Sequence, residues 1–434
     1  MIYLLSLILF LAPFYIFKFS VFSIPTTVLE ILIYLALLVR LLVWIKDKRA
    51  PKLPSWPFLL AIGAFIVAAG ISIYTAKDRT IALGIFKGWI IDPIIFFFLV
   101  YDALKTKRDV IILATSFIAS ALWVGLWALL QYFGVVSLLF YQKQDPGSFL
   151  PYLEQKRIFG PFNSPNFLAM YLVPAFIFCL AIYREGKNKW YLGLAAFVLL
   201  VLILSLSYGA WLAMGTTLIL LLILEKRWRK WLLLIVLAGA ILLVTQWHSP
   251  KFTQLFNWQN RSTTLSRWQI WQTSGLIIKD YPILGIGLGQ FPGAYNKYIG
   301  KIAFPPLEWS PPQPHNLYLA LLINMGILGL VSFIGLVVLG LWRFWKNPYL
   351  WFIAPLFALL VHGLIDTPYF KNDLSLIFWF LIGIAAISQK SSYGLTVKGL
   401  PAGKAGITSS TDSAGFGGRN RIISNKIKEL RRKK

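Results

Sequence analysis

The feature that most limits the fold of this chain is its series of long apolar runs, which short polar segments separate. Hydrophobic residues make up 58% of the 434 residues, and charged residues make up only 13%. One soluble core cannot hide so much apolar surface, whereas a bilayer can cover it. The composition therefore predicts an all-α polytopic membrane protein.

Windows of roughly 20 apolar residues are expected to cross the membrane, and about twelve candidate transmembrane helices appear. They are residues 1–17, 26–45, 58–75, 81–101, 110–133, 166–184, 191–206, 209–224, 231–246, 316–342, 349–365 and 374–388. The run from 191 to 224 is too long for one crossing, so we divide it at SLSYGAW. The first window lacks a basic segment and a cleavage site, so we expect a retained span rather than a signal peptide.

Lys and Arg gather in every second loop between these windows. Roughly 27 of them lie on one side of the predicted bundle and about 13 on the other. The positive-inside rule then predicts a multi-pass protein of the cytoplasmic (inner) membrane with both termini in the cytoplasm. Two long polar segments, 134–165 and 247–315, face outward, and an extracytoplasmic active site is expected among them.

The predicted domains are a transmembrane domain, 1–388, and a disordered basic cytoplasmic tail, 389–434. About eleven of the 42 Lys and Arg lie in this tail, which suits anionic lipid headgroups better than RNA, so no nucleic acid is expected. The single cysteine, Cys179, cannot form an intrachain disulfide, and there is no HExxH or CxxC motif. We expect no cofactor and no metal.

The external loop of about 247–315, between the ninth and tenth spans, contains STTLSRWQIWQTSGLIIKDYP. Apolar residues recur there every three or four positions before Pro282, and Ser262 or Thr263 can begin a helix. The pattern predicts an amphipathic helix at the membrane interface, with its Trp side among the headgroups. Arg267 flanks that side and either anchors the helix or contacts a lipid phosphate.

The other outer loop ends in RIFGPFNSPNFLAMYL, residues 157–172. Its Gly-Pro and Ser-Pro pairs predict turns, and Asn166 is expected to cap the sixth span with Arg157 just outside it. A helix N-terminus beside an arginine can bind an anion, and a plain Asn cap is the alternative. Lys87, inside the fourth span, either adds charge to such an external anion site or extends to the headgroups.

The segment PQPHNLYLALLINMGILGL places one of only three histidines at the mouth of the tenth span. His315, followed by Asn316, is either a capping or packing residue or a general base, since imidazole can exchange a proton near neutral pH. Glu308 is the reserve base. His362 and Asp366, four residues apart in HGLID, form a polar pair on one helical face and are expected to support the site.

Several of these segments occur in the order found in the O-antigen ligase and polymerase superfamily. The resemblance covers a motif-bearing core of about residues 155–370 and includes RIFGPFNSPNFLAMYL, SLSYGAW, RWQIWQTS, PILGIGLGQF, PHNLYLALLINMGILGL and HGLID. It implies a metal-independent, inverting glycosyltransferase of lipopolysaccharide or polysaccharide biosynthesis. The implied donor is a glycan on a polyprenyl (undecaprenyl) diphosphate, and the acceptor is a saccharide, lipid or protein at the outer face. Carried over, His315 acts on the acceptor hydroxyl and Arg267 binds the diphosphate.

One position departs from the resemblance. The family commonly has Ser-Arg-Gly after the seventh span, and this chain has Ser207-Tyr208-Gly209. Tyr208 can donate a hydrogen bond to a phosphate oxygen but brings no cation. Either Lys87 or Arg157 supplies the charge, or the donor is held differently, or the activity is weaker. The alternatives for the whole chain are a repeat-unit polymerase, a protein O-oligosaccharyltransferase and, more distantly, a transporter or flippase of lipid-linked sugars.

Overall fold

The structure of the protein is a computed structural model. It describes residues 1–21, 24–136, 157–249, 252–253, 263–342 and 348–391. Nearly all of the predicted tail, much of the first outer loop and residues 254–262 of the long loop, with the expected cap Ser262, lie outside this range.

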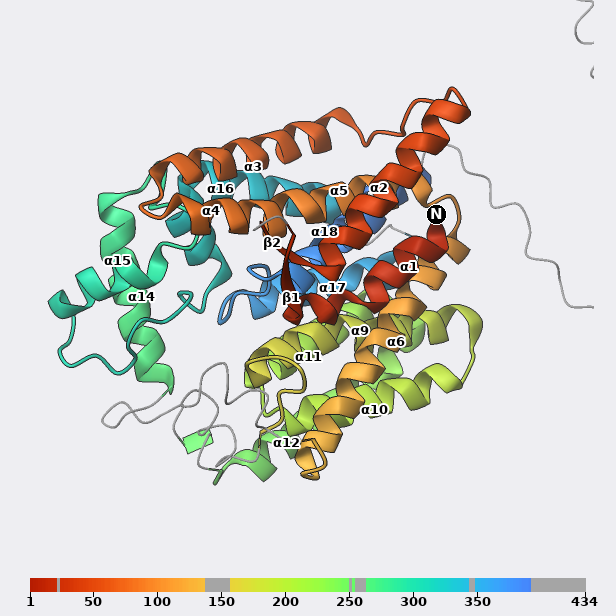
Figure 1. The fold of residues 1–434 in the computed structure, drawn as a ribbon. Coiled ribbons are helices and arrows are strands. Elements are labelled where there is room, and N and C mark those ends of the chain that lie inside the picture. The colour runs from red at the N-terminus through yellow and green to blue at the C-terminus, as the bar shows by residue number, and fades with distance from the viewer. Residues whose placement is uncertain (22–23, 137–156, 250–251, 254–262, 343–347, 392–434) are drawn as a thin grey trace, which may run out of the picture. The chain divides into compact units, whose positions relative to one another are not determined.

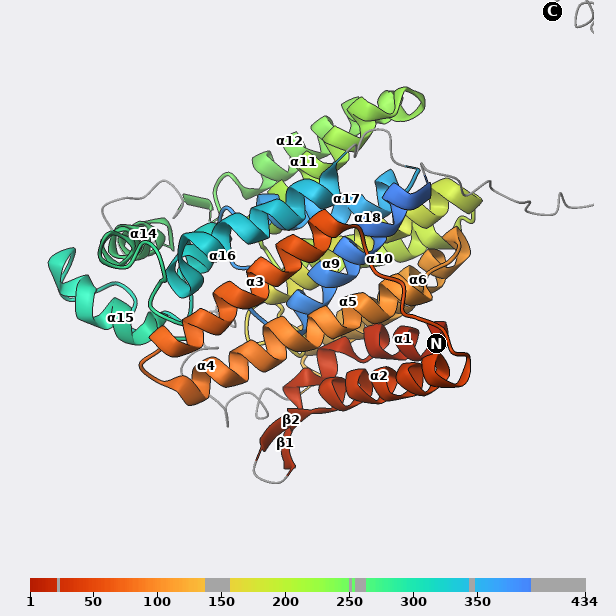
Figure 2. The same cartoon turned by 90° about the horizontal axis from the view of Figure 1, so that it is seen from above.

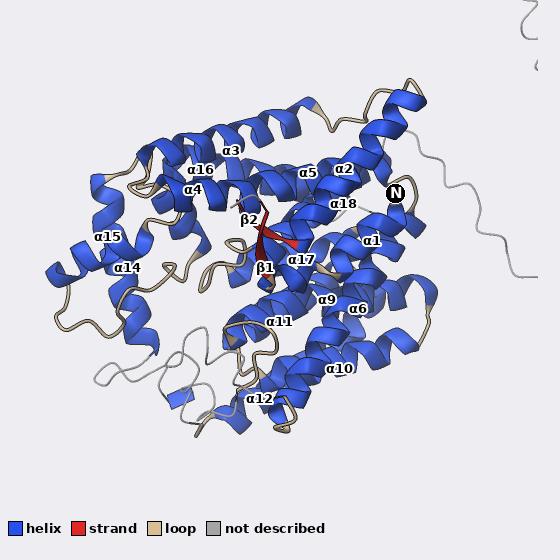
Figure 3. Cartoon of the chain, in the orientation of Figure 1, coloured by secondary structure: helices blue, strands red, loops and turns tan. Residues whose placement is uncertain are grey.

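The described chain is helical apart from one antiparallel hairpin near the N-terminus (Figures 1 and 3). In this hairpin β1 (Lys18–Val21) pairs with β2 (Ile24–Thr27), with Lys18 opposite Thr27. The predicted all-α class is therefore confirmed, with this hairpin as the exception among the described residues.

The helices that precede the long loop are α1 (Ile2–Phe10), α2 (Val28–Lys46), α3 (Trp56–Thr75), α4 (Arg79–Ile85), the π-helix η2 (Phe86–Ile91), α5 (Asp92–Ala103), α6 (Lys107–Tyr132), α9 (Pro165–Gly186), α10 (Trp190–Leu204), α11 (Tyr208–Leu224) and α12 (Leu232–Gln246). The remainder contains α14 (Thr263–Asp280), α15 (Phe291–Tyr298), α16 (Leu317–Leu341), α17 (Leu350–His362) and α18 (Asn372–Ser391). Short 3-10 turns are η1 (Ala12–Ile16), η3 (Lys226–Trp231) and η4 (Ile299–Lys301).

Among the described residues, 7 helices are long and apolar enough to cross a membrane. They are α2, α3, the continuous α4–η2–α5 segment, α6, α9, η3 with α12, and α16. The helices α10, α11 and α17, and the apolar part of α18, are also apolar but only 10–17 residues long. Every sequence window overlaps a helix, so a multi-pass membrane protein is indicated, while the count of twelve spans stays a prediction.

The first window differs from its expectation. The helix α1 has 9 residues and is followed by a 3-10 turn that contains Pro13. Proline has no N–H to donate to the preceding turn, and its ring crowds that turn, so continuation of the α-helix through it is disfavoured. At 1.5 Å per residue, α1 is only about 14 Å long, which is too short for a full crossing.

The break inside the long apolar run lies where the sequence predicts it. The helix α10 ends at Leu204, and α11 begins at Tyr208. Leu206 between them has a left-handed backbone (φ 49°), which the α-helix does not accommodate. The two resulting ends bring Ser205 and Ser207, both buried, to one end of the bundle.

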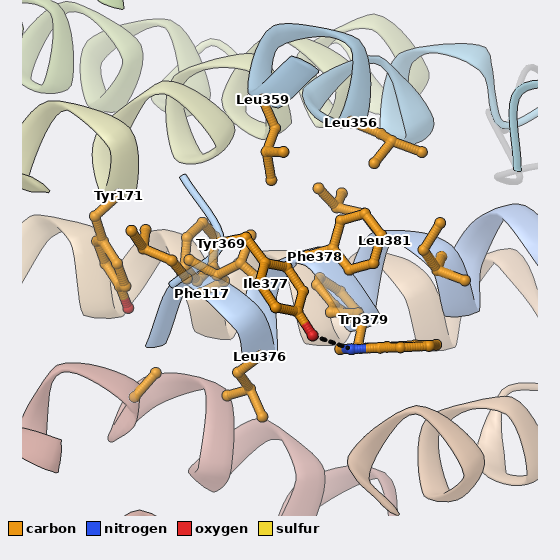
Figure 4. Close-up of a cluster of buried hydrophobic side chains, with 14 of the residues drawn as sticks. Phe117, Tyr171, Leu356, Leu359, Tyr369, Leu376, Ile377, Phe378, Trp379 and Leu381 are labelled. Carbon is orange, nitrogen blue, oxygen red and sulfur yellow. Dashed lines mark hydrogen bonds between the residues drawn. The ribbon is translucent and has the colours of Figure 1, made fainter. Parts of the chain in front are cut away.

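The core lies where α18 packs against α5 and α17, and where α17 packs against α9. Figure 4 shows its aromatic side chains, among them Tyr171, Phe378 and Trp379. The indole Nε1 of Trp379 donates a hydrogen bond to the Tyr369 hydroxyl at 3.2 Å. Tyr369 belongs to the segment between α17 and α18, so the core holds this segment in place.

Charged side chains gather where α6 begins and where α9 and α11 end. Lys107 at the start of α6 pairs with Glu185 at the end of α9 at 2.6 Å. Neighbouring Arg184 pairs with Glu225 just after α11. Lys107 also lies over the ring of Tyr349, which precedes α17. These contacts bring together the starts of α6 and α17 and the ends of α9 and α11, and we call the charged side chains there the basic cluster.

The long loop folds onto the first half of α16. Its helix α14 packs on α15 and α16 and buries Ile270, Thr273, Ser274 and Ile277. The buried face is therefore a different face from the predicted apolar stripe, on which Gly275 is exposed and Trp268 is 47% exposed. The helix itself is present, and the position of its Trp side at the membrane interface stays a prediction.

The GIGLG segment, whose sequence predicts a tight turn rather than a phosphate loop, inserts into a break in α16. Gly326 interrupts that helix with φ 64°. The N–H of Ile286 donates to the carbonyl of Ile323 at 2.8 Å, and a side chain on Gly287 (φ 96°) would collide with Ala76. Only glycine fits such a left-handed, crowded position, and the turn prediction is confirmed.

Candidate functional site

The candidate site centres on Asp366, which lies in the segment between α17 and α18. Its Oδ1 is 3.3 Å from Nδ1 of His315, and its Oδ2 is 3.8 Å from Nη2 of Arg267. Oδ2 also accepts a hydrogen bond from Nδ2 of Asn166 at 3.0 Å. One carboxylate therefore joins three side chains that come from the long loop, the start of α9 and the mouth of α16.

Asp366 is almost fully buried, with 3% of its surface exposed. Burial raises the pKa of its carboxyl group, but other effects outweigh it. The hydrogen bond from His315 and the charges of His315, Arg267 and His362 lower this pKa well below its ordinary value. Asp366 is consequently an anion, and its charge faces the guanidinium group of Arg267.

His315 is positioned by its own backbone and by the helix that follows it. Its φ is 49°, a left-handed value that a non-glycine residue rarely adopts. The next residue, Asn316, caps α16 by accepting from the N–H groups of Tyr318 and Leu319, each at 3.0 Å. Nδ2 of Asn316 donates to the carbonyl of Leu364 at 2.8 Å. The cap thus ties the histidine to the Asp366 segment.

Arg157 reaches the same cluster through Asn166. Its Nη2 donates to Oδ1 of Asn166 at 3.3 Å, and its Nε donates to the carbonyl of Ser205 at 3.0 Å. Ser207 donates to the same Asn166 oxygen at 3.1 Å. The break between α10 and α11 therefore supplies two contacts to the cluster.

The capping prediction for Asn166 is wrong. The N-cap of α9 is Ser164, whose side chain accepts from the N–H of Asn166, and Pro165 occupies the first turn. Proline suits that position because the first helical N–H has no partner within the helix. The carboxamide of Asn166 is therefore available to bridge Arg157 and Asp366.

His362 and Asp366 are neighbours as predicted, but Asp366 lies in the turn that follows α17 rather than on the helix. The helix α17 ends at His362, with Gly363 as its C-cap. The chain turns there, and the N–H of Asp366 donates to the carbonyl of His362 at 3.0 Å. His362 is buried behind the cluster, and a side chain on Gly209 would meet its Nε2 at 3.2 Å.

Tyr208 and Glu308 lie beside the cluster. The Tyr208 hydroxyl contacts Gln246 and Ser249, each at 3.2 Å, at the end of α12. Glu308 accepts a hydrogen bond from Ser266 at 3.0 Å, one residue before Arg267. Tyr208 follows Ser207, which contacts Asn166, and Glu308 contacts Ser266, which precedes Arg267. Both residues therefore border the site.

Lys87 pairs with a residue that the sequence reasoning did not consider. Its Nζ is 2.7 Å from Oε2 of Glu30, a buried residue in the first turn of α2. Nearby, Asp92 accepts a hydrogen bond from the hydroxyl of Tyr34 at 2.5 Å. The charge of Lys87 thus balances an anion within the bundle. An acidic residue at the start of an otherwise apolar window was the signal that could have revealed Glu30.

The site lies at the opposite end of the bundle from the basic cluster. Asn166 begins α9 and Ser207 precedes α11, whereas Arg184 and Glu225 stand at the far ends of these helices. Among the described residues, no three His, Cys, Asp or Glu side chains gather as a set of metal ligands. The arrangement offers an imidazole, a buried carboxylate and two guanidinium groups.

These features define a multi-pass helical membrane protein with a charged site formed where several helix ends and the long loop meet. Residues 193–334 match the family model described as O-Antigen ligase. An O-antigen ligase of Salmonella typhimurium is 27% identical over 175 residues, which are 38% of this chain and 42% of that protein. Both matches support the O-antigen ligase superfamily, which the motifs predict.

The matched segment spans less than half of the Salmonella relative. The family range contains Arg267, Glu308 and His315 but ends before His362 and Asp366. The contacts of Asp366 therefore join residues inside the matched range to residues outside it.

Proposed function

We propose that this protein transfers a glycan from a polyprenyl-diphosphate carrier to an acceptor hydroxyl at the outer face of the cytoplasmic membrane. The similarity to an O-antigen ligase supports glycan transfer in lipopolysaccharide biosynthesis. The observation that carries the proposal is the shared contact of His315 and Arg267 with Asp366.

His315 is the proposed base. A proton on Nδ1 can be donated to Asp366, and this tautomer leaves the lone pair of Nε2 for the acceptor. The acceptor oxygen forms a bond to the anomeric carbon while the bond from that carbon to the diphosphate oxygen breaks. The hydroxyl proton passes to Nε2, and the bonding pair leaves with the polyprenyl diphosphate. A single displacement of this kind inverts the anomeric centre.

Arg267 is the proposed partner of the departing diphosphate. Guanidinium groups bind phosphate oxygens through paired N–H donors and stabilise charge as it develops. The side chain of Arg267 is 28% exposed and lies at the edge of the cluster, so a ligand can reach it. Arg157 adds a second positive charge through Asn166. We therefore expect no divalent metal to be required.

The position of the cluster supports an extracytoplasmic site. Basic loops mark the cytoplasmic side of a membrane protein, and the basic cluster around Lys107 and Arg184 lies at one end of α6 and α9. Asn166 stands at the other end of α9. A lipid carrier presents its head group at that surface, where a site for the diphosphate has to lie.

The test is reconstitution of the full-length protein in liposomes with a polyprenyl-diphosphate glycan and separate saccharide, lipid and peptide acceptors, with and without EDTA. We expect transfer to one acceptor class, insensitivity to EDTA and a loss of roughly 10²–10⁴ in rate for His315→Ala. His248→Ala is the matched control, because His248 is exposed just after α12. Glycan that crosses the bilayer without transfer, unaffected by His315→Ala, would indicate a flippase instead.

A further inference from the structure

A segment that we call the strap, residues 304–315, crosses α14 and ends at His315. Glu308 in the strap accepts from Ser266 at 3.0 Å. Five residues along α14, the indole N–H of Trp271 donates to the carbonyl of Pro314 at 3.0 Å. Because both contacts lie within a turn or so of Arg267 on the same helix, the strap borders the proposed reaction site (Figures 1 and 2 show α14 and α15 together beside α16).

Two aromatic side chains of the strap are exposed on the protein surface. Phe304 is 78% exposed and Trp309 is 60% exposed. Their ring centroids are 6.2 Å apart with the planes at 87°, an edge-to-face pair. The side chains on either side of Trp309 are held, since Glu308 contacts α14 and Ser310 accepts from Asn296 of α15 at 2.9 Å. The pair is therefore an exposed surface on a fixed support.

We propose that Phe304 and Trp309 bind a saccharide ring of the substrate next to the reaction site. This inference rests on the proposed function and names a saccharide ring as the part of the substrate that the strap recognises. The C–H face of a pyranose is apolar and carries slight positive charge, so it stacks on the negative face of an aromatic ring. Sugar hydroxyls need acceptors at the edge of that ring, and a carboxylate offers about four lone-pair sites, of which Ser266 uses one at Glu308.

The setting of the pair favours a sugar over lipid. Trp309 lies between the carboxylate of Glu308, which is hydrogen-bonded to α14, and the hydroxyl of Ser310, which is hydrogen-bonded to α15. The adjoining helix α15 is polar on its exposed side, where Lys297 lies. Binding sites for small polar ligands combine such aromatic faces with a few fixed polar groups. Insertion into the bilayer would instead require Glu308 to lose contact with water.

The saccharide can belong to the donor glycan or to the acceptor, and the experiment distinguishes these sources. The full-length protein in lipid nanodiscs is titrated with free oligosaccharides of hexoses and N-acetylhexosamines, and saturation-transfer NMR measures binding. We expect binding in the wild type and in His315→Ala alike, because stacking needs no catalysis. Trp309→Ala and Phe304→Ala should each weaken it roughly tenfold, as loss of a central aromatic anchor commonly does.

Trp309→Phe should keep most of the binding, since it retains an aromatic face. Trp190→Ala is the matched control, because Trp190 is 80% exposed at the start of α10, the end next to the basic cluster. Transfer assays with Trp309→Ala then identify the source of the saccharide. With kcat unchanged, a raised KM for the acceptor assigns the bound ring to the acceptor, and a raised KM for the lipid-linked donor assigns it to the donor glycan.

Two results would overturn the proposal: no binding by any of the oligosaccharides, or equal binding by both alanine variants and the wild type. If Trp309→Ala leaves saccharide binding intact but lowers the tryptophan quenching by brominated lipids, the pair is a membrane anchor. Aromatic-dependent binding in a protein that transfers no glycan would refute the proposed function and leave this inference standing.

Discussion

Nδ1 of His315 lies 3.3 Å from Oδ1 of Asp366, and the other oxygen of that carboxylate faces Arg267 at 3.8 Å. The same buried carboxylate therefore contacts His315, the proposed base, and Arg267, which is proposed to bind the diphosphate. Its role can be tested by removing the charge while keeping the shape of the side chain.

Asp366→Asn should lower kcat by roughly 10²–10⁴, because an amide neither fixes the imidazole tautomer nor stabilises the imidazolium that forms. The KM for the donor should change much less. Steady-state kinetics in proteoliposomes measure both constants. Asp280→Asn is the control, since Asp280 contacts Tyr298 at the far end of α14. A kcat within threefold of the wild type would remove Asp366 from the mechanism.

The pKa of Asp366 also predicts how stability depends on pH. Its folded pKa lies below the ordinary 3.8, so the ionised carboxylate stabilises the folded protein above about pH 3.8. That contribution is lost as the pH falls through the lower, folded pKa. The difference in Tm between the wild type and Asp366→Asn should shrink below pH 4. A difference that stays the same below pH 4 would contradict this assignment.

Asn166 should respond more strongly to a new charge than to truncation. Asn166→Asp places a second carboxylate about 3 Å from Oδ2 of Asp366, and two like charges at this distance repel. Asn166→Ala only removes hydrogen bonds, of about 1 kcal/mol each. We expect lower activity and lower Tm in the order wild type, Asn166→Ala, Asn166→Asp. Exposed Asn188 at the opposite end is the control position.

Gly287→Ala should destabilise the insertion of the long loop into α16. The added Cβ would lie 2.5 Å from Cα of Ala76, at a position with φ 96°. The strain and the displacement should lower the free energy of unfolding by roughly 1–3 kcal/mol, measured by thermal unfolding in detergent. Gly293→Ala is the control, because its Cβ meets nothing within 4 Å and the residue lies in α15. Equal stabilities would show that the turn moves freely.

Lys87→Gln separates an ion pair from a substrate site. If the role of Lys87 is its ion pair with Glu30, the variant leaves a buried carboxylate without its cation, so Tm should fall while the donor KM stays constant. If the residue contributes to the external anion site, the donor KM should rise with little change in Tm. Exposed Lys77→Gln provides the control for loss of one positive charge.

The apolar windows determined where the chain forms helices, because helix location in a membrane protein depends on composition along the sequence. They also placed the break near Leu206 and the long loop with its helix. They did not predict the length of α1 or which face of α14 is buried. The α1 helix stops shortly before Pro13, and packing on α15 and α16 decides which face of α14 is buried.

The sequence predicts His315 and Arg267 as site residues because each stands in a segment that resembles a family motif, and their roles stay a prediction. Asp366 was placed with His362 on one helix, and Asn166 was read as a cap. Their actual partners are 51 and 200 residues away, at His315 and Asp366 respectively. Such pairings arise only when helix ends meet in three dimensions, since spacing along one helix says nothing about its neighbours. The sequence alone determined the membrane class and the chemical groups present, and tertiary packing decided which buried anion those groups share.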